Sequence, residues 1–542
     1  MERDLGKLLI LLCAILPVAL PASAQNALTL AQRIEQITAR PIFKHSTVGV
    51  EVYDLTDQQI LVAMNKDKLF TAGSTTKVVT EGTALALLGG DYRFHTRVYY
   101  TGSIAPDGTL QGDLVLVASG DPNLSGRVQL EDTLDFTASD HSYAGVLGGK
   151  SVPGEPLRVL KELASGVLMK GIWRIRGSVI VDASLFSSNH VEPGTHTTIS
   201  PVVLNDNVID VSAISDAAVG GPVSIQVAPE LSYLKVINKV MTGKPDSDPE
   251  LQFTSDIGEA DGSHTVVLEG SVPAGRERAQ AAYKVKDPVL FATEGFREAL
   301  RWAGIVLDEP ALEGTPASTF PANAQRTMLV EHISPPFKEE VKLTLKVSQN
   351  LHAATTPYLL GAILAHNSAD AFQKGLGLER RFLSSAGLDP ESVSQLDGEG
   401  GIGSAFSPDF MVRFLAYMSR QPYGRLFFDS LPVLGRDGTL SQAMEDLPAA
   451  GHVHAKTGSY VVSNALNNGV MLLGKGLVGY VDAANGHKLI FAAYVNQVPL
   501  HNMDDVAAVG GMLCEIAGLA YQYAPPLTVP PRKTPTRVRV HH

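Results

Sequence analysis

The chain has 542 residues, of which 44% are hydrophobic and 18% charged, with 50 glycines and 32 prolines. This composition is typical of a globular protein rich in turns, and the length suits two to four folded units at roughly 150 residues per domain. The formal net charge is −12, which disfavours binding to nucleic acid or to anionic lipid, because both need a cationic surface. We therefore expect no nucleic-acid partner, and membrane association that is at most weak.

The first 24 residues have the pattern of a signal peptide that directs export. Two basic residues precede an apolar run from Leu8 to Leu20, and small residues at Ala22–Ala24 stand where a signal peptidase reads the chain. Cleavage is predicted after Ala24, which gives a periplasmic or cell-envelope protein. The alternative is a retained anchor, but Pro17 and Pro21 interrupt the apolar run, whereas a spanning helix needs about 20 apolar residues.

The mature chain begins with the pattern of a β-hairpin followed by a helix. Valines alternate with other residues from Val48 to Val52, and a second strand is expected at Ile60–Met64 after a polar turn. Apolar residues at helical spacing predict a helix over Ser74–Leu88, which Gly89-Gly90 terminates.

A long middle region reads as a β-rich insertion. Between about Tyr99 and Val285 short apolar runs are separated by Gly, Pro, Asp and Ser, a pattern that favours strands and turns. The runs with the strongest strand pattern are Leu114–Val117, Val179–Val181, Val223–Val227 and Val266–Leu268.

After the insertion the pattern becomes helical and then returns to strands. Helices are expected over Leu290–Ala303 and Glu339–Thr355. Strands are expected at Val453–Thr457, Leu477–Val481 and Leu489–Val495, the last two joined by a turn at Asn485-Gly486. The whole predicts a mixed α+β unit formed by residues 25–98 and 286–524 and interrupted by an insert at 99–285.

The C-terminal part of the chain carries two further expectations. Cys514 lies among apolar residues at helical spacing and is expected to be a buried structural thiol, and export would remove the other cysteine, Cys13. Residues 525–542 are Pro-rich and basic, so we expect disorder there, with weak contact to an anionic polymer as the alternative.

Ser74-Thr75-Thr76-Lys77 places a hydroxyl and an amine one helical turn apart on the same helix face. A serine needs a neighbouring base to become a nucleophile, and a lysine serves as that base when burial or another cation lowers its pKa. The start of a helix also favours a developing oxyanion, because its backbone N–H groups and dipole point there. Ser74 is thus the candidate nucleophile and Lys77 its candidate base.

Two later motifs add groups of the same chemistry. Ser348-Gln349-Asn350, in the stretch predicted to be helical, supplies a hydroxyl that can relay a proton and an amide that can hold a carbonyl or the lysine amine. Lys456-Thr457-Gly458, on a predicted strand, supplies a cation and a hydroxyl for a carboxylate and a glycine that permits close approach of substrate backbone. Taken singly, each motif is more often structural.

In the order Ser-X-X-Lys, Ser-X-Asn and Lys-Thr-Gly, the motifs match the set of penicillin-binding proteins and serine β-lactamases. The long gap from Lys77 to Ser348 resembles the D-alanyl-D-alanine carboxypeptidase/endopeptidase family, the class C low-molecular-mass penicillin-binding proteins, from about Ala27 to Tyr521. Further segments similar to that family are Gly112–Leu116, Gly120–Leu124, Gly177–Phe186, Ser200–Asn207 and Lys346.

The resemblance implies a penicillin-binding, serine β-lactamase-like transpeptidase domain with a β-rich insert of two small domains. It implies hydrolysis of peptidoglycan stem peptides ending in D-Ala-D-Ala, β-lactam antibiotics as covalent inhibitors, and no cofactor or metal. Ser74, Lys77, Ser348 and Asn350 would be catalytic. Lys456, Thr457, Gly458 and Ser459 would bind substrate, with the backbone N–H groups of Ser74 and Ser459 as the oxyanion hole.

Four features depart from that family's pattern. Asp397–Gly401 reads Asp-Gly-Glu-Gly-Gly where Asp-Gly-Ser-Gly-Leu-Ser is usual, and Gln349 replaces the usual Asp. The segment His190–Thr198 lacks the usual Trp-containing stretch, which leaves recognition of the stem's side chain open. Asn464–Gly476 looks like extra sequence that alters the cleft.

Other functions remain as alternatives. A β-lactamase or esterase on the same fold shares these motifs, and a catalytically silent peptidoglycan-binding protein would fit the departures. The chain has no Gly-X-Ser-X-Gly sequence, the usual signature of α/β-hydrolases. His452 and His454 share one strand face, but we expect a structural or solvent-facing role for them rather than metal binding, because no partners stand at suitable spacing.

Overall fold

The structure is a computed structural model that describes residues 28–143, 149–187, 190–215, 218–275, 278–308 and 325–523. The predicted signal peptide at residues 1–24 and the basic tail at 525–542 lie outside the described residues, so both stay predictions.

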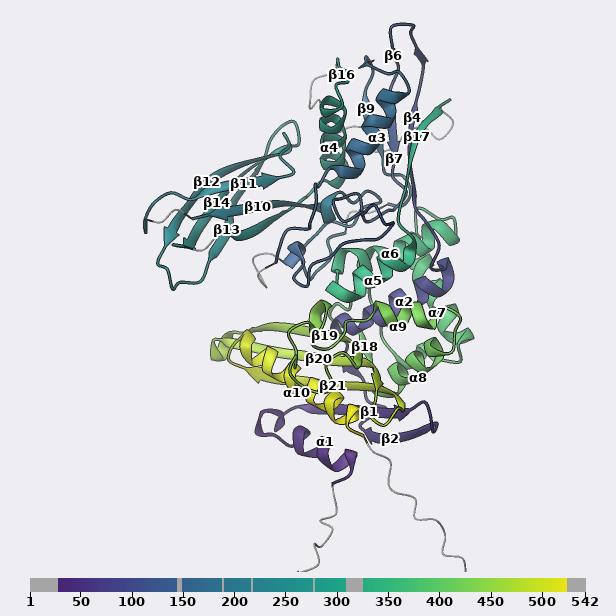
Figure 1. Ribbon diagram of the computed structural model, residues 1–542, viewed down its shortest axis with the longest axis vertical. Helices are drawn as coiled ribbons and strands as arrows, with labels where there is room; N and C mark the ends of the chain where they lie inside the picture. The colour runs from purple at the N-terminus through teal and green to yellow at the C-terminus, as the bar shows by residue number, and fades with distance from the viewer. Residues whose placement is uncertain are drawn as a thin grey trace, which may run out of the picture.

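Five antiparallel strands in the order β19-β20-β21-β1-β2 form the central sheet (Figure 1). Their bounds are β1 Thr47–Asp54, β2 Gln59–Met64, β19 Val453–Asn464, β20 Gly469–Asp482 and β21 Lys488–Leu500. Both predicted hairpins are confirmed, and Gly486 takes a positive φ of 87° at the second turn. Since β1 pairs with β21 over its full length, the two ends of the chain build one sheet.

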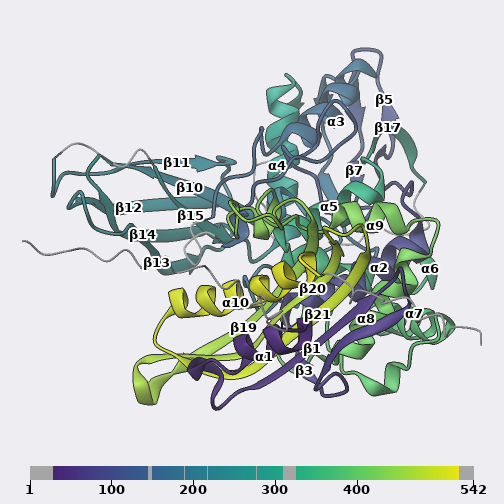
Figure 2. The ribbon, with the colours of Figure 1, turned by 60° about the horizontal axis from the view of Figure 1, so that its bottom comes forward.

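Helices cover both faces of this sheet. Helices α1 (Leu30–Thr38) and α10 (Met503–Tyr521) lie on one face and α8 (Pro408–Ser419) on the other, an arrangement that Figure 2 shows from below. Cys514 on α10 is 4% exposed and packs with Val506, Val509, Leu513 and Ile516. It is thus a buried thiol, as predicted.

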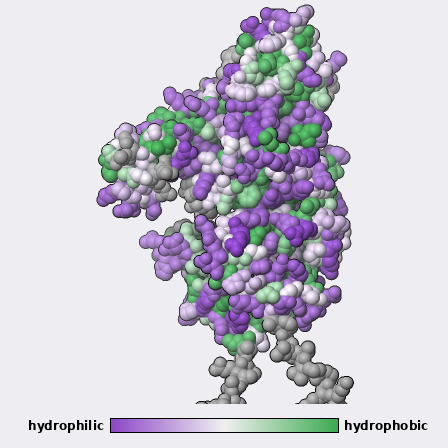
Figure 3. Space-filling view, viewed as in Figure 1, coloured by the Kyte–Doolittle hydropathy of each residue, from purple (hydrophilic) through white to green (hydrophobic). Residues whose placement is uncertain are grey.

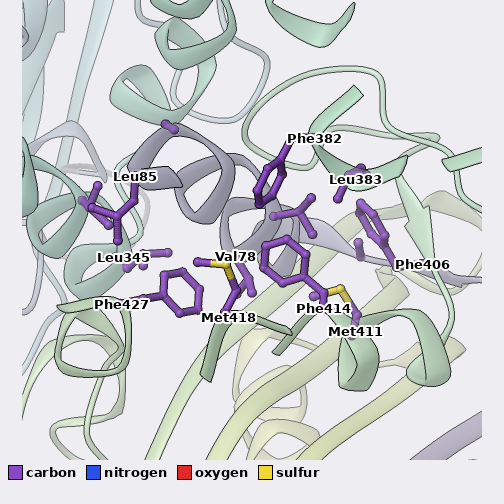
Figure 4. Packing of buried hydrophobic residues seen from close by; sticks show 14 of the residues in the cluster. Val78, Leu85, Leu345, Phe382, Leu383, Phe406, Met411, Phe414, Met418 and Phe427 are labelled. Carbon is purple, nitrogen blue, oxygen red and sulfur yellow. The ribbon is translucent and has the colours of Figure 1, made fainter. Parts of the chain in front are cut away.

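Helix α2 (Thr76–Leu88) lies at the centre of a helical layer next to the sheet. It is buried at every position from Thr76 to Leu85, and Figure 4 shows Val78 and Leu85 packed near Phe414 and Phe427. The other helices of this layer are α5 Phe337–Val347, α6 Asn350–Leu364, α7 Ala371–Ser385 and α9 Gly424–Ser430. A short 3-10 turn, Gly73–Thr75, precedes α2, so Ser74 is fixed to a rigid, fully packed helix.

The predicted helix over Glu339–Thr355 is wrong in one respect, because it is two helices. Helix α5 ends at Val347, and Ser348 adopts a left-handed conformation with φ of 64°. The side chain of Gln349 then accepts a hydrogen bond from the N–H of Leu351 and caps α6. The Ser348-Gln349-Asn350 motif therefore spans the break: Ser348 and Gln349 lie between the two helices, and Asn350 begins α6.

The insert begins with a mixed sheet of order β17-β4-β7-β9, covered by α3 (Arg158–Met169) and α4 (Pro288–Trp302). The strands are β4 His95–Tyr100, β7 Leu114–Val117, β9 Val179–Asp182 and β17 Thr327–Ile333; a smaller sheet contains β5 Ser103–Ile104, β6 Thr109–Gln111, β8 Arg174–Ile175 and β16 Val306–Leu307. Helix α4 shares its core with α3 and β9. The unit boundary at 285/286 stays a prediction, although α4, just after it, packs on the insert.

A second part of the insert projects from the body of the molecule as a lobe of two sheets (Figure 1). The sheet of order β11-β10-β15 contains β10 Val208–Ile214, β11 Ser224–Ala228 and β15 Ala279–Lys284; the sheet of order β12-β14-β13 contains β12 Leu234–Gly243, β13 Glu250–Gly258 and β14 His264–Pro273. Val211, Val240 and Leu268 meet between the sheets.

The surface is mostly hydrophilic, with apolar residues scattered among polar ones over the face shown in Figure 3. Within the part of the chain that the structure describes, none of the helices has the length and apolar character needed to cross a bilayer.

Candidate active site

Ser74 and Lys77 meet where the 3-10 turn passes into α2. The Nζ atom of Lys77 lies 2.8 Å from Ser74 Oγ, the hydrogen-bond contact expected of a nucleophile and its base. Lys77 is fully buried, and burial lowers its pKa, against the nearby carboxyl of Glu399, which raises it.

Two acceptors fix the direction of the Lys77 amine. Nζ donates to Asn350 Oδ1 at 2.7 Å and to the backbone carbonyl of Glu399 at 3.1 Å. A neutral amine has two N–H bonds and one lone pair, and these two acceptors occupy both N–H bonds. When Lys77 is neutral, its lone pair is thus left for the hydroxyl of Ser74, as a base requires; when protonated, the amine donates to Ser74 Oγ as well.

Ser348 stands between the two lysines of the motif set. Lys456 Nζ donates to Ser348 Oγ at 2.8 Å and to the carbonyl of Thr457 at 2.9 Å. Burial, together with the charge of Lys77, lowers the pKa of Lys456 well below its ordinary value. Burial and repulsion between the two amines thus both oppose a double positive charge in the site.

Tyr143, from the insert, is a site residue that the sequence analysis missed. Its hydroxyl lies 2.7 Å from the carbonyl of Ser348 and 2.9 Å from Asn350 Oδ1, so it supports the break between α5 and α6. No motif surrounds Tyr143, and only the folded chain brings it to Asn350.

Strand β19 borders the site as the edge strand of the central sheet. The N–H of Ala455 points out of the sheet, since it donates to the carbonyl of Pro432 at 2.9 Å. Alternate residues of a strand point their N–H groups to the same side, so those of Thr457 and Ser459 also face outward. The predicted oxyanion donor Ser459 N–H therefore lies on the open edge.

Two glycines allow β19 to approach the turn that carries Ser74. Gly73 has a φ of 51°, and a Cβ there would lie 2.7 Å from Ser459 N. A Cβ on Gly458 would lie 2.2 Å from the carbonyl oxygen of Ala72. Gly458 was expected to make room for substrate backbone, but the backbone that presses against it is that of the chain's own turn.

Lys475 is a second residue that the motifs did not reveal. It lies opposite Ser459 in the β19–β20 pairing, and its Nζ donates to Ser459 Oγ at 2.6 Å. The segment Asn464–Gly476, expected to be extra sequence, forms the far end of this hairpin.

The altered loop Asp397–Gly401 forms one wall of the site. Asp397 Oδ1 accepts from the N–H groups of Glu399 at 3.0 Å and Gly400 at 2.6 Å, which turns the Glu399 carbonyl toward Lys77. A Cβ on Gly400 would lie 1.8 Å from the carbonyl oxygen of Gly73. Pro193 and Gly194, in the segment without the Trp stretch, also line the cleft, and Pro193 lies next to Gly401 of the loop. A cleft of about 230 Å³ is lined by Ser74, Pro193, Gly194, Asn350, Glu399, Gly400, Gly401, Ser459, Tyr460 and Val461.

A buried ion network ties the insert to the α5–α6 break. Asp206, fully buried, accepts from Arg127 at 2.5 Å, His141 at 2.9 Å and His352 at 3.1 Å. Gln349 Nε2 donates to the same carboxylate at 3.3 Å. Gln349 thus provides an N–H donor to Asp206. The Asp that is usual at this position would place a second carboxylate against Asp206.

His452 and His454 stack on aromatic rings, with centroid distances of 5.0 Å to Tyr521 and 4.0 Å to Phe428. Among the residues that the structure describes, neither belongs to a group with metal-ligand spacing.

The comparisons with known proteins agree with this geometry. A model of the "D-Ala-D-Ala carboxypeptidase 3 (S13) family" matches residues 30–512. The D-alanyl-D-alanine carboxypeptidase of Actinomadura sp. (strain R39) is 26% identical over 523 residues, which cover 93% of this chain and 87% of that protein. The D-alanyl-D-alanine carboxypeptidase DacB of Haemophilus influenzae is 24% identical over 464 residues, 83% of this chain and 85% of that protein.

A solved structure, penicillin binding protein 4 from Haemophilus influenzae, superposes with a TM-score of 0.66 at 20% sequence identity, covering 90% of this chain and 99% of that one. The predicted penicillin-binding, β-lactamase-like fold is therefore confirmed. Since the family model also spans nearly the whole chain, the chain belongs to the D-Ala-D-Ala carboxypeptidase 3 (S13) family.

Proposed function

We propose that this chain hydrolyses stem peptides ending in D-Ala-D-Ala through an acyl-enzyme on Ser74. The observation that carries the proposal is the position of Lys77 Nζ, which lies 2.8 Å from Ser74 Oγ while Asn350 Oδ1 and the carbonyl of Glu399 also lie within hydrogen-bond distance. In the neutral form of the amine these two acceptors take its N–H bonds and leave its lone pair for Ser74. Ser74 Oγ attacks the carbonyl of the penultimate D-Ala, and its proton passes to Lys77 Nζ. The outward N–H of Ser459 and the N–H of Ser74 bind the oxyanion.

The second half of acylation uses the pair Ser348 and Lys456. Ser348 Oγ accepts from Lys456 and is free to give its own proton to the leaving amine as the C–N bond breaks. Lys77 then gives the proton that it took from Ser74 to Ser348 Oγ, which restores the hydroxyl of Ser348 and the neutral amine. Lys456 with Thr457 binds the terminal carboxylate. Water hydrolyses the ester and releases the shortened peptide.

The proposed partners are peptidoglycan stem peptides as substrates and β-lactams as covalent inhibitors. β-Lactams have an acyl carbonyl that Ser74 would attack and a carboxylate that Lys456 would bind.

The N-terminal pattern supports action outside the cytoplasm, in the periplasm or cell envelope. The same nucleophile serves carboxypeptidase trimming and endopeptidase cleavage of cross-links, so mass analysis of products from cross-linked muropeptides measures their balance.

Covalent labelling with a fluorescent penicillin tests the nucleophile. The wild-type protein and Ser385→Ala, a control at the exposed end of α7, should label equally, and Ser74→Ala should not label. Lys77→Ala should acylate at least about 10²-fold more slowly, the usual contribution of a general base. An undiminished adduct in Ser74→Ala would refute the proposal. Turnover of a chromogenic cephalosporin would instead favour the β-lactamase alternative.

A further inference from the structure

Two buried glutamates meet in the wall of the cleft, Glu192 from the insert and Glu399 from the altered loop. They are 1% and 3% exposed, and their carboxyl groups lie close enough to interact through a hydrogen bond. An ionised carboxylate only accepts hydrogen bonds, so two carboxyl groups bond to each other only when one carries a proton.

The surroundings show which glutamate holds that proton. Glu192 accepts from the N–H of Gly194 at 2.9 Å and from both the N–H and the hydroxyl of Thr195, so its carboxylate is well stabilised. Glu399 Oε2 is buried and has no hydrogen-bond partner in the described part of the chain. Burial and the neighbouring Glu192 raise the pKa of Glu399 to about 11. Against its own burial, hydrogen bonds from Glu399 and Thr195 keep the pKa of Glu192 low.

Glu399 is placed where its charge acts on the base of the reaction. Its backbone carbonyl accepts a hydrogen bond from Lys77. Glu399 itself lines the cleft that contains Ser74. A negative charge on Glu399 would hold a proton on Lys77 and so remove the lone pair that faces Ser74. The other charged or titratable groups around the pair and Lys77 are Asp397, Glu81, Lys456, Tyr143 and Lys284.

We propose that Glu192 and Glu399 are positioning residues that hold one proton between them and so keep Lys77 in its neutral, working form. The inference rests on the proposed function of Ser74 and Lys77. During acylation the Ser74 proton moves to Lys77 Nζ and then to Ser348, which has given its own proton to the leaving amine, while the proton on Glu399 stays in place. Lys77 then gains and loses its proton beside a glutamate pair that carries one negative charge instead of two, which favours the charged lysine less.

The test is the pH dependence of acylation by a penicillin, measured as the second-order rate constant. In Glu192→Gln the new amide donates to Glu399 and stabilises its ionised form, so Lys77 stays protonated to higher pH. We expect the rising limb to move up by about one pH unit or more, which makes acylation about tenfold slower below the midpoint. In Glu399→Gln the amide replaces the protonated carboxyl, so the midpoint of the limb should not rise, whatever the absolute rate.

The double variant Glu192→Gln/Glu399→Gln separates electrostatics from structural damage. Its midpoint should be no higher than that of Glu399→Gln, because the negative charge of Glu192, which raises the pKa of Lys77, is also removed. Glu269→Gln, which changes a glutamate of β14 that pairs with Lys239 in the projecting lobe, should match the wild type. A uniform rate loss in Glu192→Gln without a shift of the limb, or a shift that persists in the double variant, would overturn the inference.

An infrared difference spectrum decides the point if Glu192→Gln does not fold or if no penicillin reacts. At about pH 9, where an ordinary glutamate is ionised, wild type minus Glu399→Gln should show the C=O stretch of a protonated carboxyl. Absence of that band overturns the inference. Failure of Ser74 to react at any pH, with the band present, refutes the proposed function alone.

Discussion

Replacing Asp206 with Asn should lower the free energy of unfolding by about 3–5 kcal/mol. This is the usual cost of removing one partner of a buried ion pair, because the other charge stays buried without its partner. The carboxylate is fully buried and receives hydrogen bonds from Arg127, His141, His352 and Gln349. Three of these donors are cations, because the carboxylates raise the pKa of each histidine to about 10, against burial, which lowers it. An amide neither neutralises them nor accepts at both of its polar atoms.

Urea unfolding, followed by tryptophan fluorescence, measures the loss. Asp132→Asn is the matched control, since Asp132 pairs with Arg93 at the surface with its side chain 52% exposed, and such pairs contribute about 0–1 kcal/mol. The reasoning about the network fails if the two variants lose the same free energy of unfolding.

Three more outcomes follow from the site. The pKa values of His141 and His352 are raised to about 10, so their contribution to stability is complete below the unfolded value near 6.5 and falls as pH rises toward 10. The urea midpoint should therefore drop more between about pH 6.5 and 9 in the wild type than in Asp206→Asn; equal drops would contradict this. Gln349→Asp should lower both the penicillin acylation rate and the urea midpoint, because a carboxylate would face Asp206 and Asp140. The loss in the free energy of unfolding should be at least about 1 kcal/mol. An unchanged urea midpoint would contradict this prediction. Gly73→Ala should slow acylation at least about tenfold with the fold retained, since the new Cβ would press on Ser459 N, a predicted oxyanion donor. Loss of a single oxyanion donor usually costs more than tenfold in rate. A wild-type rate would show that β19 moves aside without loss of the donor.

Local pattern was enough for the parts of the fold in which neighbours in sequence are neighbours in space. Alternating valines predicted β1, and helical spacing with two terminal glycines predicted α2. The order of three short motifs also named residues that the structure brings together: Ser74, Lys77, Ser348, Asn350 and Lys456.

The errors and omissions arise where tertiary contacts decide. The apolar spacing from Glu339 to Thr355 continues through Ser348, but the left-handed residue there breaks the helix, and nothing in the pattern marks it. Tyr143 and Glu192 come from an insert far from the motifs in sequence, so only folding places them beside Asn350 and Glu399. Glu399 did stand out as a departure from the family's pattern. Its proposed role, however, depends on its contact with Glu192, which the sequence pattern does not reveal.

The open edge of β19 has a consequence for the protein's solubility. An unpaired strand edge is a template on which another chain can add a strand and start aggregation. Here the segment Pro432–Leu434 already pairs with the beginning of β19, and the register shifts after Tyr460. Between that segment and the register shift, the described chain leaves the outer edge from Lys456 to Tyr460 unpaired, a stretch that suits a short peptide. The covering segment and the register shift thus shorten the regular part of this edge and make it a poorer template for a strand of a second copy.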